Sequence, residues 1–137
     1  MKYNGVIQRK LALLDHYLME LSPRVGDLTA EAFRSDWVLQ RMAERSLQVM
    51  IEICIDVAER ILAIEGAGPV ATSAEAFRAL EQLGIVQSAR PYEEMAGFRN
   101  RIVHQYQDVD PDAVYSVLST RLSDFRRFRD EIDQAGA

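Results

Sequence analysis

Apolar residues recur at helical spacing along most of the chain and predict an all-α protein. In residues 4–21 they follow the i, i+4, i+7 stripe of an amphipathic helix. Ser22-Pro23 is expected to end this helix, because proline disfavours helical backbone at the residue before it. Residues 22–35 then form a connector, in which Thr29 caps a short helical turn.

The longest apolar pattern covers residues 36–65 and predicts a helix of about eight turns. Gly66 is expected to end that helix in a left-handed conformation. Thr72-Ser73-Ala74-Glu75 is a capping box, in which the Thr accepts from the helix start and the Glu reaches back. It predicts a helix over 73–83 that Gly84 ends.

The last third of the chain predicts two further helices. One runs from about Pro91 to His104 or Tyr106. The other begins at Asp110-Pro111, a cap followed by proline at the first helical position. It is expected to continue until the chain frays at Gly136-Ala137. Short connections between long amphipathic helices favour an antiparallel bundle.

The composition fits one ordinary globular domain. The chain has 137 residues, of which 48% are hydrophobic and 27% charged, enough to bury a core. Seven glycines and four prolines are few for an all-β chain with many tight turns. We therefore expect a single helical domain over residues 1–137, folded as an antiparallel bundle of four to five helices.

Nothing in the sequence predicts export or membrane insertion. Met1-Lys2-Tyr3-Asn4 lacks the apolar core of a signal peptide, and no run of about 18 uncharged apolar residues could cross a membrane. The one cysteine, Cys54, excludes an intrachain disulfide framework and a four-Cys zinc site, and is expected to be buried. We expect a cytoplasmic protein with no membrane partner.

One segment differs in charge from the rest of the chain. The formal net charge is −5, which argues against a broad basic surface that binds nucleic acid. From Met95 to Gln107, however, there is no acidic residue. Two arginines, an asparagine, a histidine and a tyrosine are crowded into this local positive island: Arg99, Asn100, Arg101, His104 and Tyr106.

These residue types could cleave RNA. A histidine of near-neutral pKa can take the 2′-hydroxyl proton or protonate the leaving oxygen, and an arginine can stabilise the charged phosphate. No metal or other cofactor is then needed, and no set of residues here has metal-ligand spacing. Arg99 and His104 lie about 140° apart around a regular helix, so the site needs a helix end or a second copy of the chain. The alternative is a polar cluster without catalysis.

The run Arg99-Asn100-Arg101-Ile102-Val103-His104-Gln105-Tyr106 resembles the Arg-x4-His-x-Tyr motif of the HepT-like branch of the HEPN superfamily. The preceding Met95-Ala96-Gly97-Phe98 and the order of the helices also resemble that family. The resemblance implies a homodimeric helical bundle in which the motifs of both subunits face one cleft. It also implies a metal-independent endoribonuclease that acts as the toxin of a toxin–antitoxin pair.

The resemblance further assigns roles to the motif residues. Arg99 and His104 would be catalytic, Asn100 would shape the site, and Arg101 and Tyr106 would support RNA binding. The partners would be RNA and a minimal nucleotidyltransferase (MNT) antitoxin, which transfers AMP to Tyr106. That AMP would add bulk and a negative phosphate to the positive island. The alternative function is a non-catalytic helical binding partner of a nucleotidyltransferase, which the acidic net charge favours.

The long predicted helix carries two acidic residues whose role can be interpreted in two ways. Glu52 and Asp56 lie four residues apart and so share a face. That face is either solvated or meets the motif helix, where one carboxylate would pair with Arg99 or orient His104.

Structural roles are expected for several basic residues outside the motif. Arg126, Arg127 and Arg129 are interspersed with acids, which is typical of an exposed helix rather than an RNA-binding surface. His16 is expected to be structural, at or near the surface.

The remaining candidates are aromatic residues and one glycine. Tyr92 and Tyr115 are expected to be partly buried in helix packing rather than to stack on bases. Trp37 is expected to anchor the core or a dimer. Gly97 is expected to permit a close helix approach near the motif, because glycine is costly inside a helix.

Overall fold

The computed structural model describes residues 2–104 and 109–137, without the side chain of His104. Within these residues there are seven α-helices and no strand. The helices are α1 Val6–Val25, α2 Ala30–Arg34, α3 Trp37–Ile64, α4 Ser73–Gln82, α5 Arg90–His104, α6 Pro111–Thr120 and α7 Leu122–Gly136. The all-α prediction is confirmed, and the count exceeds the expected four to five, because α2 is a helix and α6 and α7 are separate.

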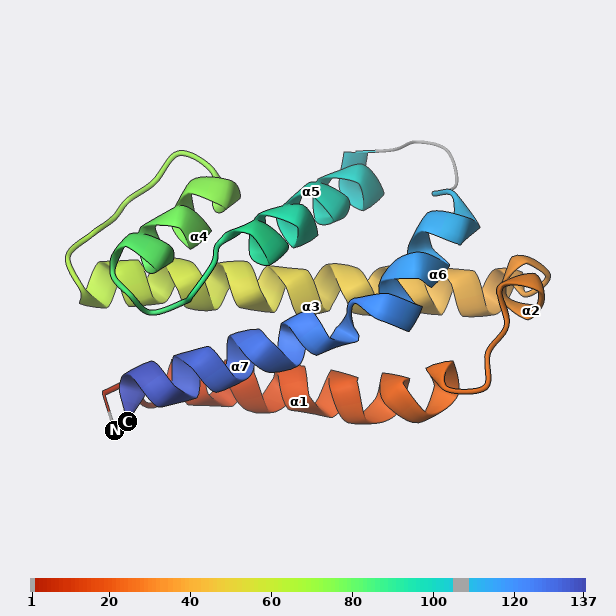
Figure 1. Cartoon of the computed structure of the whole chain (residues 1–137), viewed down its shortest axis with the longest axis horizontal. Helices are drawn as coiled ribbons and strands as arrows, with labels where there is room; N and C mark the ends of the chain where they lie inside the picture. Colours follow the sequence, from red (N-terminus) through yellow and green to blue (C-terminus); the bar gives the residue numbers. More distant parts are fainter. Residues whose placement is uncertain (1, 105–108) are drawn as a thin grey trace.

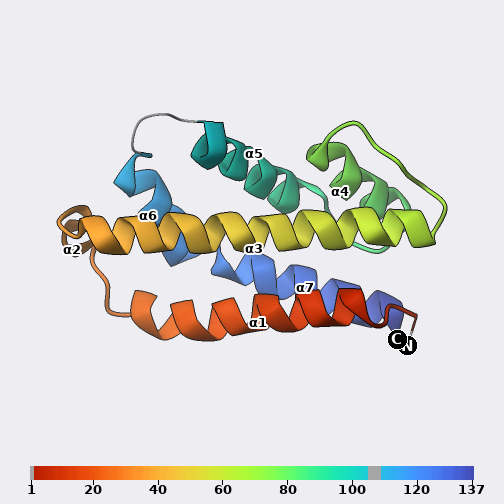
Figure 2. The same ribbon diagram turned by 180° about the vertical axis from the view of Figure 1, so that it is seen from behind.

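The long helix α3 forms the middle of the bundle. Figure 1 shows α4 and α5 along one side of α3 and α1 and α7 along the other, and α3 contacts all four. The view from behind gives the same arrangement (Figure 2). The colours show that α1 and α5 run opposite to α3, as the antiparallel bundle requires.

The N-terminal helix is longer than the sequence predicts. The expected apolar stripe is buried, but α1 continues through Pro23 to Val25. Pro23 lies in the last turn, so its missing N–H removes a single helical hydrogen bond. In the same turn the Arg24 guanidinium donates to the carbonyl of Glu20 at 2.5 Å. The prediction that Ser22-Pro23 ends the helix is therefore wrong.

The predicted boundaries of the middle helices are confirmed. The Thr29 hydroxyl accepts from the N–H of Ala32 at the start of α2. Gly66 and Gly84 have φ angles of +69° and +75° directly beyond α3 and α4, which glycine adopts without strain. Thr72 accepts from the N–H of Glu75 at 3.1 Å, and the Glu75 carboxylate accepts from the N–H of Ala71.

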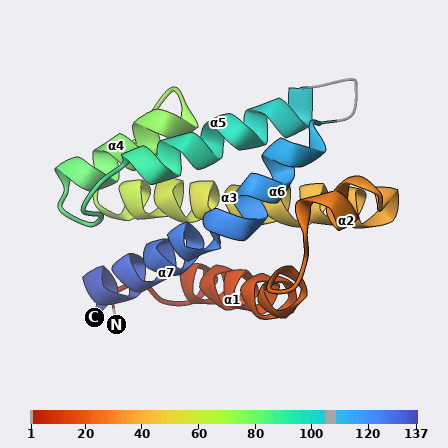
Figure 3. The same ribbon diagram turned by 45° about the vertical axis from the view of Figure 1, so that its right-hand side comes forward.

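The predicted last helix is broken in two at Arg121. The hydroxyl groups of Ser119 and Thr120 donate to the carbonyls of Tyr115 and Ser116, at 2.8 and 2.6 Å, and so compete with the helical hydrogen bonds there. The break redirects the chain, so that α6 packs on α2 and α3 whereas α7 packs on α1 (Figure 3).

The expected fraying at the end of the chain is wrong for Gly136. This residue belongs to α7 and is buried. Its carbonyl accepts a hydrogen bond of 2.6 Å from the N–H of Lys2. A Cβ at this position would lie 2.8 Å from the ring of Tyr3, so the close approach of the two chain ends requires a glycine.

An aromatic cluster fixes the first half of α5. Tyr92 lies in helix packing, as expected, but is fully rather than partly buried. Its ring centroid lies 5.7 Å from Phe77 on α4 and 5.2 Å from Phe128 on α7. These contacts hold the helix that carries the predicted motif. Cys54 is also fully buried, as expected, and burial raises the pKa of its thiol.

Within the described part of the chain, no helix combines the length and apolar character that a membrane span needs.

Candidate active site

The predicted motif lies in the second half of α5. Phe98 is buried against the core and fixes the rotation of this helix. Asn100 and Arg101 are therefore exposed and Arg99 is half-buried. His104 is the last residue of α5, and its side chain lies outside the described residues, as does all of Tyr106.

Arg99 is held at the meeting point of three helices. Its Nη2 donates to the hydroxyl of Ser73, the first residue of α4, at 3.3 Å. Its Nη1 lies 3.9 Å from Oε1 of Glu52 on α3. The Arg99 side chain is 23% exposed, and its Nε is buried without a hydrogen-bond partner in the described part of the chain.

The structure separates the two acids of α3. Glu52 pairs with Arg99, which confirms the second of the two interpretations for this residue. Asp56 instead pairs with Lys10 at 2.8 Å and with Arg60 at 2.9 Å. Burial raises the pKa of Asp56, but the hydrogen bonds from Lys10 and Arg60 outweigh it, and the net shift is downward. Asp56 therefore serves ion pairing across α1 and α3 and has no contact with Arg99.

Arg101 lies on the other side of α5. It is about 160° from Arg99 around the helix axis, and its guanidinium lies 5.3 Å from the ring centroid of Phe98. It borders a cavity of about 100 Å³ together with Glu94 and Arg121, which pair with each other at 3.2 Å. The two arginines of the motif therefore do not converge on one point within a single chain.

The HepT-like family model, described as "Ribonuclease HepT-like", matches residues 14–132. A protein named tRNA nuclease HepT, from Aphanizomenon flos-aquae, is 30% identical over 122 residues, which cover 88% of this chain and 82% of that protein. A protein named mRNA nuclease HepT, from Shewanella oneidensis, is 30% identical over 131 residues, 94% of this chain and 97% of that protein. This chain belongs to the HepT-like family. The predicted membership of this family is thus confirmed.

Solved structures agree with the HepT-like fold. One contains the tri-AMPylated HEPN toxin of Shewanella oneidensis in complex with MNT antitoxin; it superposes with a TM-score of 0.86 at 30% identity, over 96% of this chain and 99% of that chain. A second, a toxin–antitoxin with AMP-PNP, gives the same TM-score at 29% identity, over 96% of this chain and 99% of that chain. The predicted HEPN-like helical fold is therefore confirmed.

The HepT-like motif is less isolated from negative charge than its sequence indicates. The acid-free run from Met95 to Gln107 predicts a positive island, yet α3 brings Glu52 next to Arg99. The Gln48 amide donates to Oε1 of Glu52 at 3.2 Å. Sequence reasoning missed Ser73 and Gln48, because neither residue is near the motif in the chain and no spacing rule connects them.

Gly97 lies one turn before Arg101 on the exposed side of α5. A Cβ built on it meets no atom within 4 Å among the described residues. The predicted close helix approach is therefore wrong within this chain. Trp37 is 62% exposed, so its predicted core role is wrong as well, and its role as a dimer anchor stays a prediction.

The remaining candidates either make structural contacts or lie exposed on a helix surface. Arg126 donates to Ser22, and Arg129 pairs with Asp15 across α1 and α7. The hydroxyl of Tyr115 donates to the carbonyl of Leu28 at 2.7 Å. His16 is exposed on α1, and Arg127 is exposed on α7.

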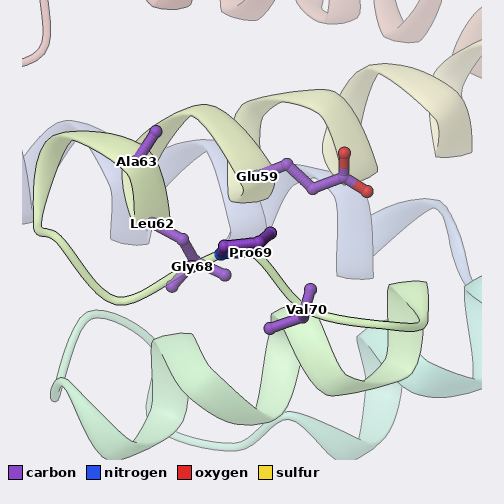
Figure 4. A pocket seen from close by; sticks show the side chains of 6 residues that line it. All are labelled: Glu59, Leu62, Ala63, Gly68, Pro69 and Val70. Carbon is purple, nitrogen blue, oxygen red and sulfur yellow. The ribbon is translucent and has the colours of Figure 1, made fainter.

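Two further observations bear on ligands. Among the described residues, no group of three His, Cys, Asp or Glu side chains is placed to hold a metal ion. A cavity of about 300 Å³ lies between the last turns of α3 and the loop before α4, and Figure 4 shows its lining. Glu59 is the one ionisable residue among the described side chains that line it, and no motif residue takes part, so this cavity is not a candidate for RNA cleavage.

Proposed function

We propose that this HepT-like chain is a metal-independent endoribonuclease toxin, which acts in the cytoplasm as one domain and is silenced by a nucleotidyltransferase antitoxin. The observation that carries the proposal is the position of Arg99. A cation on the family's motif helix is half-buried, held between α3 and α4, and still partly open to solvent. Two relatives that align with 88% and 94% of this chain are named as RNA nucleases.

In the proposed reaction, the 2′-oxygen of a ribose attacks the adjacent phosphorus and the bond from phosphorus to the 5′-oxygen breaks. The imidazole of His104 takes the proton of the 2′-hydroxyl group. A second imidazole, His104 of the partner copy, gives a proton to the leaving 5′-oxygen. Arg99 stabilises the negative charge that builds on the phosphate oxygens. Asn100 shapes the site, and the exposed guanidinium of Arg101 holds the RNA backbone.

A second copy of the chain supports this chemistry. Arg99 and His104 lie about 140° apart around a regular helix, and a second copy of the chain would bring both residue types around one phosphate. Apolar side chains are exposed on the two helices that carry Arg99 and Glu52: Val103 on α5 is 45% exposed, and Val38 and Met42 on α3 are 61% and 56% exposed. Exposed apolar side chains of this kind are suited to a dimer interface, to which the exposed Trp37 would also contribute.

Inhibition by a covalently attached AMP would act through the positive charge of Arg99. The related Shewanella oneidensis toxin is tri-AMPylated in complex with its MNT antitoxin. In this chain we assign the AMP acceptor to the hydroxyl of Tyr106, two residues after His104 in the sequence. The added phosphate would compete with RNA for Arg99 and repel the RNA backbone.

The deciding experiment is digestion of total cellular RNA by the purified protein in the presence of EDTA. Wild type should cleave, whereas His104→Ala should cleave at least about 100-fold more slowly with unchanged helical circular dichroism, because proton transfer by a positioned side chain contributes that much. His16→Ala is the matched control: the His16 side chain is exposed on α1, and this variant should cleave like wild type.

Three outcomes would contradict the proposal in different ways. Loss of wild-type cleavage in EDTA would overturn the metal-free reaction, and undiminished cleavage by His104→Ala would remove its catalytic role. No cleavage by unmodified wild-type dimer would favour the alternative, a non-catalytic binding partner of a nucleotidyltransferase.

A further inference from the structure

Glu52 makes the one ion pair of Arg99 among the described residues. The carboxylate is 42% exposed and lies 3.9 Å from Nη1 of Arg99, a distance that gives attraction without a hydrogen bond. The Gln48 amide holds the same carboxylate oxygen at 3.2 Å, one turn earlier on α3. On its other nitrogen, Nη2, Arg99 donates to Ser73.

We infer that Glu52 is a positioning residue for Arg99 in RNA cleavage, with Ser73 as its counterpart on α4; the inference rests on the proposed function. Arginine has a long side chain with many rotamers, and a catalytic group must be held in place before the substrate arrives. Glu52 and Ser73 come from two helices that pack against α5, so they restrict the guanidinium from two directions.

The Glu52–Arg99 pair is longer than the ion pairs that carry a direct hydrogen bond, as is the exposed Arg90–Glu94 pair at 3.6 Å. Arg60 approaches Asp56 to 2.9 Å, and Arg34 approaches Asp112 to 2.7 Å, both with direct hydrogen bonds. Those pairs use the donors of the arginine. A guanidinium has five N–H donors, and Arg99 commits one of them, to Ser73. The Nε of Arg99 is buried, so the N–H groups on Nη1 and Nη2 that Ser73 does not use are the ones left for phosphate oxygens while Glu52 orients the guanidinium.

The same carboxylate has an opposite effect on RNA binding. It orients Arg99, which favours the transition state, but its negative charge lies beside the place where the phosphate binds and weakens ground-state binding. Removal of the charge should therefore lower kcat and KM together. This combination distinguishes positioning from a structural role, because a loss of folded protein lowers the apparent kcat and leaves KM unchanged.

The test measures cleavage of one labelled RNA, chosen from the wild-type digest, by four proteins. Glu52→Gln should lower kcat about tenfold, as expected for a misplaced catalytic group, and lower KM roughly threefold by removing one nearby charge. Asp56→Asn makes the same charge change one turn along α3, away from Arg99, and should match wild type. Arg99→Ala reports on the proposed function itself. Circular dichroism and thermal melting establish that each variant is folded.

The outcomes separate the two hypotheses. Arg99→Ala as active as wild type would overturn the proposed role of Arg99 and the inference with it. An inactive Arg99→Ala beside a Glu52→Gln that behaves like wild type would overturn the positioning role alone. A Glu52→Gln with lower kcat, unchanged KM and a lower melting temperature would assign Glu52 to stability instead.

Discussion

The hydroxyl group of Tyr92 on α5 donates a hydrogen bond to the carboxylate of Glu131 on α7. The other carboxylate oxygen of Glu131 accepts from the backbone N–H of Gln87 at 2.7 Å, just before α5. Burial, and then the hydrogen bond to Glu131, raise the pKa of Tyr92, so its hydroxyl stays protonated and donates. Glu131 thereby fixes the start of the helix whose second half carries Arg99.

Tyr92→Phe should lower the free energy of unfolding by about 1–2 kcal/mol, because a hydrogen bond to a charged acceptor is lost while the ring packing stays. Urea unfolding followed by circular dichroism measures this change. Tyr17→Phe is the control, since the Tyr17 hydroxyl has no hydrogen bond in the described part of the chain and its loss should change stability little. Equal stability of both variants would contradict the structural role of Glu131.

Tyr3 should make the protein sensitive to alkaline pH. Burial, followed by the hydrogen bond to Glu65, raises the pKa of Tyr3 to about 12. In the unfolded chain the pKa of a tyrosine is about 10. The folded state therefore favours the protonated hydroxyl; this stabilisation is complete below about pH 10 and is lost as the pH rises towards the folded-state pKa.

Tyr3→Phe should consequently flatten the fall in unfolding free energy above about pH 10. Denaturant unfolding of wild type and variant at several alkaline pH values gives the two slopes. A Tyr3→Phe profile parallel to wild type would show that the hydroxyl titrates alike in both states.

Gly97→Ala should stabilise the folded chain by about 0.5–1 kcal/mol, since alanine is the better helix former and a Cβ at this position meets nothing within 4 Å. Gly66→Ala is the comparison variant, for which the opposite change in stability is expected. A Cβ there also meets nothing within 4 Å, but the φ of +69° strains any other residue, so this variant should lose about 1 kcal/mol. Urea midpoints of the two variants on opposite sides of wild type would agree with this reasoning; a destabilised Gly97→Ala would mean that the open face of α5 is covered in solution.

Tyr106→Phe should block AMP transfer, because the proposed acceptor is the tyrosine hydroxyl. The measurement is intact mass after incubation with the partner nucleotidyltransferase and ATP. Tyr115→Phe, whose hydroxyl is engaged with Leu28, should still gain AMP. An unchanged mass gain on Tyr106→Phe would assign the modification to another residue.

The sequence correctly predicts those features of this fold that depend on residues close together in the chain. Thr29, Thr72 and Asp110 cap helices as expected, and Gly66 has the predicted left-handed backbone. The error at Pro23 arose because a proline in a last turn removes one hydrogen bond and not a whole helix.

Contacts between residues far apart in the sequence are harder to predict from the sequence. The break at Arg121 depends on hydroxyl groups that compete with the backbone, for which the apolar pattern has no signal. The spacing puts Glu52 on one face with Asp56 and makes both candidates for Arg99, whereas Ser73 is predicted only as part of a helix start. Its contact with Arg99 depends on how α4 packs against α5, which one sequence does not specify.

The hydrogen bond from Lys2 to Gly136 has a practical consequence for engineering. It places both described ends of the chain at one corner of the molecule, far from the C-terminal end of α5 (Figure 1). Any segment or tag attached before Lys2 or after Gly136 leaves from this corner. A short linker between the two would give a circular permutant, with new ends opened in a surface loop. Such a chain would keep Arg99, Glu52 and Ser73 on three helices that no cut interrupts.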